Sequence, residues 1–152
     1  MSDIYLVSPD NWFGLVSRLC VALLAGGIIG LEREIKGKPA GLRTYMLVSF
    51  GSALFVLIPI LLGTFDKSAD ALPRVIQGIT AGVGFVGGGV ILRESQPHSE
   101  GAKIRGLTSA AAIWVSSALG VAAACGLWQL SLVASGLTLM VLKLVKKLEP
   151  LL

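Results

Sequence analysis

The chain has 152 residues, of which 54% are hydrophobic and only 14% are charged, and its formal net charge is +4. A soluble domain usually carries about a quarter charged residues, so this composition excludes an ordinary soluble domain. It also excludes intrinsic disorder, which needs low hydrophobicity. Two cysteines and one histidine are too few for a disulfide framework or a Cys/His metal cluster.

Five apolar segments follow one another along the chain. Each is close to the ~20 residues that a helix needs to cross a hydrocarbon core of ~30 Å. We therefore predict an all-α fold, a polytopic membrane bundle of five transmembrane helices in which residues 1–152 form a single domain. The predicted spans are residues 12–31, 42–63, 73–92, 107–125 and 128–145.

The positions of the charges predict the orientation. Ten of the 13 Lys and Arg residues lie in residues 32–44, residues 93–106 and the tail from Lys143 onward. Basic loops face the cytoplasm in membrane proteins, so we expect the N-terminus outside and the C-terminus inside. No basic region precedes the first apolar segment, which predicts a retained span and not a cleaved signal peptide. The positive charge therefore reflects topology and attraction to anionic lipid, and we predict no nucleic-acid partner.

Small residues recur at the four-residue spacing that lets membrane helices approach closely. The motifs Gly26-x-x-x-Gly30 and Ala118-x-x-x-Ala122 lie on the first and fourth spans. The third span is the richest in glycine, and two readings stay open for it: close packing within one subunit or across a dimer, or a locally unwound helix that exposes carbonyls to an ion. Its candidate residues are Gly78, Gly82, Gly84, Gly87, Gly88 and Gly89.

Two of the polar residues within the predicted spans, Arg18 and Gln77, are functional candidates. Arg18 stands about 9 Å inside the first span at the helical rise of 1.5 Å per residue. Its side chain either reaches back to the interface or finds a partner within the bundle. Gln77 in the third span needs a hydrogen bond, which either another helix or a ligand would supply.

The two long cytoplasmic loops resemble each other. In both, the descending helix ends in Arg-Glu, and the ascending helix opens with an Arg and a Thr beside a Gly-Leu pair. We predict weak parallel repeats whose charges converge at the cytoplasmic face, with a Glu34–Arg43 ion pair among them; the alternative is a set of ordinary interfacial charges. The candidate functional cluster is Glu32, Arg33, Glu34, Arg43, Thr44, Arg105 and Thr108.

A metal site is a weaker interpretation of the same region. Mg²⁺ binds through one or two carboxylates together with water or backbone oxygens, which Glu32, Glu34 and Glu94 could supply. The arginines beside these carboxylates favour ion pairs instead. We therefore predict no bound cofactor, and Mg²⁺ is the one ion that these residue types would suit.

The same residues carry a family resemblance. The blocks in question are Gly30-Leu-Glu-Arg-Glu34, Lys38-Pro-Ala-Gly-Leu-Arg-Thr44, Gly84-Phe-Val-Gly-Gly-Gly-Val-Ile-Leu92, and Arg105-Gly-Leu-Thr-Ser-Ala-Ala111 with Trp114. They resemble, in order, the signature blocks of the MgtC/SapB family of bacterial inner-membrane proteins. The resemblance covers all five predicted spans. Because the chain ends at Leu152, and because of its Arg74-Val-Ile-Gln-Gly78 segment, it is most similar to the short branch that lacks a cytoplasmic C-terminal domain.

The resemblance implies a five-span protein of the bacterial inner membrane, linked to growth in low magnesium and, in longer members, to survival in macrophages. One longer member is reported to act on the F-type ATP synthase. We expect a regulatory protein of magnesium homeostasis that modulates another membrane protein; the alternative is a small ion channel or transporter. No motif of an activated nucleophile is present, so we predict no enzyme. The expected partners are the lipid bilayer, a second copy in a dimer and another membrane protein.

Overall fold

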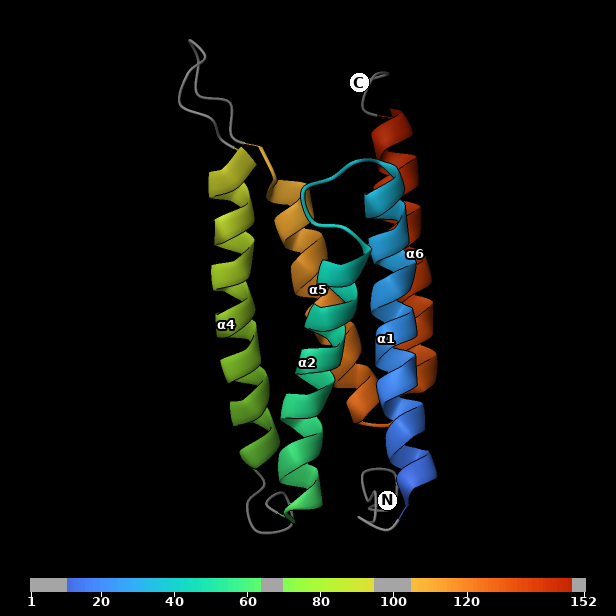
Figure 1. The fold of residues 1–152 in the computed structure, drawn as a ribbon, viewed down its shortest axis with the longest axis vertical. Helices are drawn as coiled ribbons and strands as arrows, with labels where there is room; N and C mark the ends of the chain where they lie inside the picture. The colour runs from blue at the N-terminus through green and yellow to red at the C-terminus, as the bar shows by residue number, and fades with distance from the viewer. Residues whose placement is uncertain (1–10, 64–69, 95–104, 149–152) are drawn as a thin grey trace.

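The computed structural model describes residues 11–63, 70–94 and 105–148, and its regular elements are all helices. They run up and down along one axis, so the described chain begins at one end of the bundle and leaves at the other (Figure 1). The predicted all-α bundle is therefore confirmed. The helices are α1 (Trp12–Ile35), α2 (Leu42–Leu61), α4 (Ala71–Glu94), α5 (Leu107–Ala124) and α6 (Trp128–Leu148).

Four of these helices are long and apolar enough to cross a membrane: α1, α2, α5 and residues 71–92 of α4. The apolar part of α6, Trp128–Lys143, is shorter. Figure 1 nevertheless shows α6 running beside α1 for most of the length of the bundle. The structure thus supports a multi-pass membrane protein, while the fifth span and the orientation stay predictions.

Three helices extend beyond their predicted bounds. α6 continues to Leu148 and not to residue 145, and the other two extend for local reasons. α1 continues to Ile35 and not to residue 31, since Glu and Arg are good helix formers and Lys36 pairs with Glu32 one turn earlier. α4 begins at Ala71, before Pro73, because proline is tolerated in the first turn of a helix. Its helix also runs without a break through Gly82–Gly89. The unwound third span is therefore not what the structure forms.

The centre of the bundle is α5, which contacts each of the other four described helices. The backbones of α1, α2 and α5 approach so closely that side chains larger than hydrogen do not fit at three positions. A Cβ on Gly26 would lie 2.5 Å from the Tyr45 carbonyl oxygen, and one on Gly120 would lie 1.9 Å from the Ser49 carbonyl oxygen. Gly30 is held in the same way against α2. The predicted close packing through Gly26 and Gly30 is thus confirmed within one subunit.

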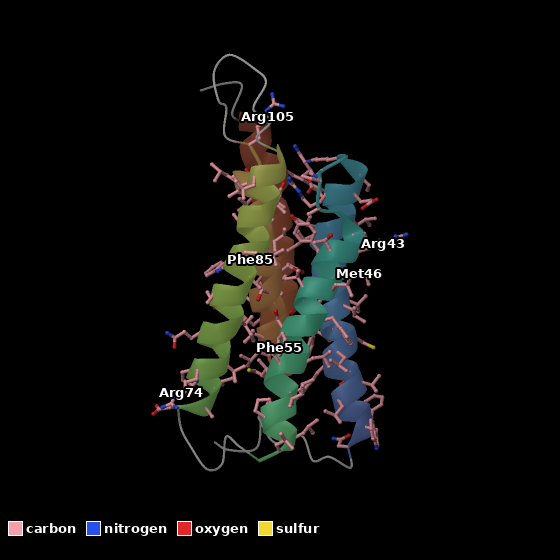
Figure 2. All side chains as sticks on the ribbon, turned by 60° about the vertical axis from the view of Figure 1, so that its left-hand side comes forward. Arg43, Met46, Phe55, Arg74, Phe85 and Arg105 are labelled. Carbon is pink, nitrogen blue, oxygen red and sulfur yellow. The ribbon has the colours of Figure 1, made fainter. Side chains whose placement is uncertain are left out.

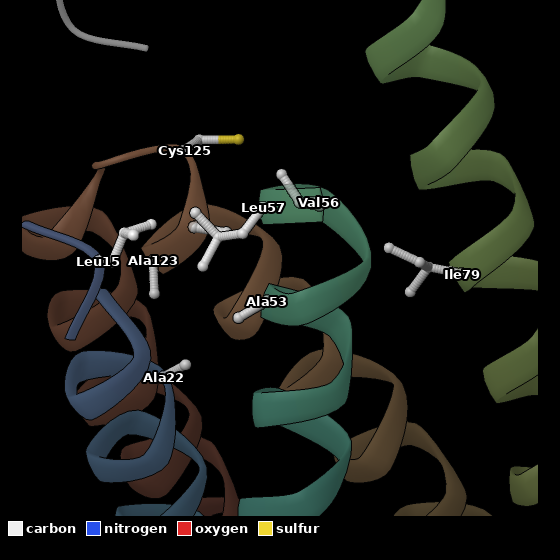
Figure 3. Packing of buried hydrophobic residues seen from close by; sticks show 9 residues of the cluster. Leu15, Ala22, Ala53, Val56, Leu57, Ile79, Ala123 and Cys125 are labelled. Atoms are coloured by element: carbon white, nitrogen blue, oxygen red, sulfur yellow. The ribbon is translucent and has the colours of Figure 1, made fainter. Parts of the chain in front are cut away.

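Hydroxyl groups and small apolar side chains fill the space between these helices. Ser49 Oγ donates to the Ala22 carbonyl oxygen at 2.7 Å, and Ser116 Oγ donates to the Tyr45 carbonyl oxygen at 2.9 Å. Near the α5–α6 turn, Ala22, Ala53 and Val56 belong to a buried apolar cluster, to which α4 contributes Ile79 (Figure 3). The interior is therefore filled by groups that pair with, or pack against, other parts of the same chain.

Candidate functional site

Two charged residues are buried where α1 ends. The side chains of Glu32 and Arg33 are only 6% and 5% exposed. Arg33 Nη1 lies 3.5 Å from Glu32 Oε2, and the ammonium of Lys36 pairs with Glu32 Oε1. Charges are rarely buried unless they are paired. We call Glu32, Arg33 and Lys36, together with the two residues that hold them in place, Tyr45 and Ser109, the buried ion cluster.

The buried ion cluster joins three helices. Arg33 Nη2 donates to Ser109 Oγ on α5 at 3.4 Å. The Tyr45 hydroxyl on α2 donates to the Ser109 carbonyl oxygen at 3.2 Å. The cluster is incompletely satisfied, because Arg33 Nε is buried without a hydrogen-bond partner, whereas the Glu32 carboxylate is held by its ion pairs with Arg33 and Lys36. The cluster therefore holds one end of the bundle together through contacts between residues far apart in the sequence. Arg33 Nε remains able to donate one more hydrogen bond.

Glu34 has a different role from its neighbour Glu32. It is exposed, and its Oε2 accepts a hydrogen bond at 2.9 Å from the N–H of Leu42, the first residue of α2. A Cβ on Gly41 would occupy the place of that carboxylate oxygen, so a larger residue there would displace the Glu34 carboxylate from Leu42. A carboxylate at a helix N-terminus satisfies a free donor and the positive end of the helix dipole. Glu34 therefore fastens α2 to the end of α1.

The predicted Glu34–Arg43 pair does not form. Arg43 is exposed and points away from the bundle, and Arg105 lies apart from it at the end of the bundle where α5 begins (Figure 2). Thr108 is exposed and Thr44 half-buried, and neither side chain makes a hydrogen bond within the described residues. Of the predicted cluster, then, only Glu32 and Arg33 belong to the buried ion cluster.

Sequence reasoning missed Tyr45 and Ser109. A signal was available, because Tyr45, Ser49 and Ser52 recur at helical spacing on an otherwise apolar α2. Such a polar stripe within a span indicates a face turned toward other helices. Ser109 and Ser116 lie on α5 at a similar spacing and are buried with it.

The two candidate metal ligands whose side chains the structure describes, Glu32 and Glu34, have other partners. No group of three His, Cys, Asp or Glu side chains that could hold a metal ion occurs among the described residues. Glu32 faces Lys36 and Arg33, which neutralise it, and Glu34 binds the start of α2. The side chain of Glu94 lies outside the described residues.

Arg18 finds a partner within the bundle. Its Nη1 donates to the carbonyl oxygen of Ala124, the last residue of α5, at 2.7 Å. The last carbonyls of a helix have no partner in the helix itself and carry the negative end of its dipole, so a cation is favourable there. Of the two alternatives for Arg18, the structure therefore supports the internal partner.

Replacing Arg18 by methionine should lower stability by about 1–3 kcal/mol, because it strands the Ala124 carbonyl in an apolar setting. Equilibrium unfolding in detergent measures the loss. Lysine at this position should recover part of it, since its ammonium also complements the helix end. An Arg18→Met variant as stable as the wild type would show that the contact contributes nothing.

The glycine-rich helix α4 lies at the edge of the bundle and is the least buried of the four long apolar helices (Figure 1). Gln77 is exposed, and within the described residues it bonds to no other helix. Of the six candidate glycines, only Gly87 comes near another helix, at Ala110 of α5; a Cβ on any of the other five would meet nothing within 4 Å. These five therefore do not pack within the subunit.

An apolar groove of about 610 Å³ separates α4 from α2. Gly78 and Gly82 line it on one side, and Gly51 and Phe55 line it on the other. Figure 2 shows Phe55 on α2 at this level, with α4 standing in front of the rest of the bundle. The groove offers volume to an apolar group and has almost nothing with which to hold an ion.

The fold and the site together define a multi-pass helical membrane protein with a tightly packed interior and an ion cluster at one end. Sequence comparison identifies the family to which this membrane protein belongs. A family model described as the MgtC family matches residues 19–151. The chain therefore belongs to the MgtC family. No solved structure gives a significant match.

Three relatives illustrate the range of the family. SrpB of Synechococcus elongatus is 46% identical over 98% of this chain and 84% of its own length. YhiD of Escherichia coli K12, named as a candidate magnesium transporter, is 39% identical over 88% of this chain. MgtC of Salmonella typhimurium is 40% identical over 77% of this chain. The chain spans 61% of YhiD and 45% of MgtC.

Proposed function

We propose that this protein is a regulatory component of magnesium homeostasis in the bacterial inner membrane, and that it acts by contacting another membrane protein. The link to magnesium is supported by the name of the relative YhiD. The regulatory role is supported by the interior of the bundle, which is the observation that carries the proposal.

That interior leaves little room for an ion path. α2 touches α1 at Gly26 and α5 at Gly120 through backbone atoms. Ser49 and Ser116 use their hydroxyl groups on backbone carbonyls, and Ser52 is bonded to Ser117 at 2.9 Å. An ion crossing between these helices would need oxygen ligands to replace its water. The hydroxyl groups that could serve are already committed to other helices.

The alternative, a small ion channel or transporter, would use the glycine-rich third span and the cytoplasmic charges. One form of it, an unwound third span with exposed carbonyls, is disfavoured because α4 is a continuous helix from Ala71 to Glu94. The groove beside it is lined by apolar side chains and glycines. Such a surface suits a lipid chain or a neighbouring helix, and this favours a protein that works through its outer face.

Growth in low magnesium tests the link to homeostasis. Expression of the chain in a bacterium that lacks its own family member should restore growth in magnesium-poor medium and have no effect in rich medium. Arg33→Met should abolish the rescue by loosening the buried ion cluster, whereas Arg43→Gln, which changes an exposed charge at the same end, should retain it. Failure of the wild-type chain to rescue growth would exclude the link.

We further propose that the groove between α2 and α4 receives a second copy of the chain. Phe85 is 88% exposed and lies on α4 between Gly82 and Val86, which line the groove. A twofold axis along the membrane normal brings together parts of the two copies that lie at the same depth. The ring of one copy can therefore enter the groove of the other, and the reverse contact forms at the same time. Glycines at the contact would let the two helices approach closely.

Gly82→Leu should therefore weaken the dimer about tenfold without lowering the unfolding temperature, because a Cβ at this position meets no other helix of the described chain within 4 Å. Light scattering of the detergent-solubilised protein reports the size. Gly136→Leu on α6, which is equally open, serves as the control and should leave the dimer intact. A monomeric wild type, or a Gly82→Leu dimer of unchanged affinity, would contradict the proposal.

A further inference from the structure

We propose that the outward face of α4 around Gln77 binds one transmembrane helix of another membrane protein, which presents a hydrogen-bonding side chain to the Gln77 amide. The inference rests on the proposed function, because it names the surface through which that contact is made. Gln77 lies within residues 71–92, the part of α4 that is long and apolar enough to cross a membrane. It is exposed, and its amide bonds to nothing within the described residues.

The position of Gln77 along α4 places its amide inside the apolar part of the membrane. Gln77 stands six residues after Ala71, the first residue of α4, which is about 9 Å along the helix. Arg74, one turn nearer to that end, has the longer side chain that suits the polar interface. A buried or lipid-facing amide without a hydrogen-bond partner is unfavourable, and glutamine side chains within spans commonly bond to another helix. A group from outside the described chain would satisfy this amide.

Thr80 on the next turn shows the contrast. It is also exposed, but its Oγ1 donates to the carbonyl oxygen of Ile76 in the same helix at 2.7 Å. A hydroxyl on a short side chain returns to the backbone one turn earlier in this way. Of these two exposed polar side chains, Gln77 is therefore the one that is left for an external partner.

The face that carries Gln77 is separate from the proposed dimer contact. Each helical residue turns by about 100°, so Gly82 lies about 140° around α4 from Gln77. A second copy at the groove therefore leaves the amide uncovered. Lipid chains carry no group that bonds to an amide, whereas a polar side chain on a helix of another protein does. The nearest exposed neighbours on this face, Ala81 and Gly84, are small, so a helix can approach to hydrogen-bonding distance.

Binding of a defined helix in liposomes tests the inference. The probe is a synthetic transmembrane peptide of about 20 residues, all leucine except for one glutamine at the depth of Gln77, and its control has leucine there as well. Energy transfer from the labelled full-length protein to the labelled peptide measures binding. The wild type should bind the glutamine peptide about threefold more tightly than the leucine peptide, since a hydrogen bond between helices in lipid contributes about that much. Gln77→Leu should bind the two peptides equally.

Thr80→Val is the matched control, because the hydroxyl of Thr80 is already bonded within its own helix, and this variant should keep the preference. Gln77→Leu should also keep the wild-type unfolding temperature and dimer size, because its amide bonds to nothing in the described chain. Equal binding of the two peptides by the wild type, or a preference that survives Gln77→Leu, would overturn the inference.

The growth assay separates this inference from the proposed function. Where the wild type rescues growth in low magnesium, Gln77→Leu should lose the rescue and Thr80→Val should retain it. Full rescue by Gln77→Leu would overturn a contact at this face and leave the regulatory role standing. Failure of the wild type to rescue growth would count against the proposed function, and the peptide assay would then decide by itself whether this face binds a helix.

Discussion

Replacing Gly120 by alanine is expected to destabilise the protein by about 3 kcal/mol or more, or to prevent its folding. The added Cβ would lie 1.9 Å from the carbonyl oxygen of Ser49 and 2.7 Å from its carbonyl carbon. These are backbone atoms, which cannot turn aside as a side chain can, so α2 and α5 would have to separate. Separation would also disturb neighbouring interhelical hydrogen bonds such as that of Ser116. Overpacking of a core commonly costs ~1–3 kcal/mol even where side chains can adjust.

Gly136→Ala is the matched control, because it makes the same chemical change on α6 where nothing lies within 4 Å. Alanine is about 1 kcal/mol better than glycine within a helix, so this variant should be as stable as the wild type or slightly more stable. Unfolding by a denaturing detergent, followed by circular dichroism, compares the two. Equal stability of Gly120→Ala and Gly136→Ala would show that α2 and α5 are not in backbone contact.

The second large effect is expected in the buried ion cluster. Arg33→Met leaves the buried Glu32 with Lys36 as its one partner, and Glu32→Gln leaves the buried guanidinium without its carboxylate. Removing one member of a buried pair costs roughly 3–5 kcal/mol, because the remaining charge is stranded. The double variant should cost less than the sum by about 1–3 kcal/mol, since neither charge then remains.

The exposed residues Glu34 and Arg43 supply the control cycle. Their side chains do not pair, so Glu34→Gln and Arg43→Gln should be additive to within about 0.5 kcal/mol. Glu34→Gln alone should cost about 1 kcal/mol by weakening the bond to Leu42. A strong coupling between Glu34 and Arg43, together with none between Glu32 and Arg33, would reverse the roles assigned to these residues.

Neighbouring residues illustrate what sequence alone could settle. Apolar length predicted the helices, and four linked blocks predicted the family. The charges around Glu32 and Glu34 were also predicted to matter, but which of them is buried depends on the face that α1 turns toward α2 and α5. Each helical residue turns by about 100°, so Glu34 points about 200° away from Glu32 and is exposed while Glu32 is not.

Other contacts depend on tertiary placement in the same way. Gly26-x-x-x-Gly30 and Gly78-x-x-x-Gly82 are the same motif, yet the first packs against α2 and the second lines the open groove between α2 and α4. Arg18 meets a carbonyl 106 positions away, at Ala124. No local pattern identifies a backbone acceptor at the end of another helix, because every helix ends with such carbonyls.

Magnesium flux into liposomes tests the central claim most directly, namely that the packed bundle of α1, α2 and α5 regulates and does not conduct. Purified protein is reconstituted into liposomes that enclose a magnesium-sensitive dye, and magnesium is added outside. We predict the same rate of dye response as in liposomes without protein, for the wild type and for Gly82→Leu alike. A flux that rises in proportion to the amount of reconstituted protein, and falls when Arg33 is replaced by methionine, would contradict this claim and establish a transport protein instead.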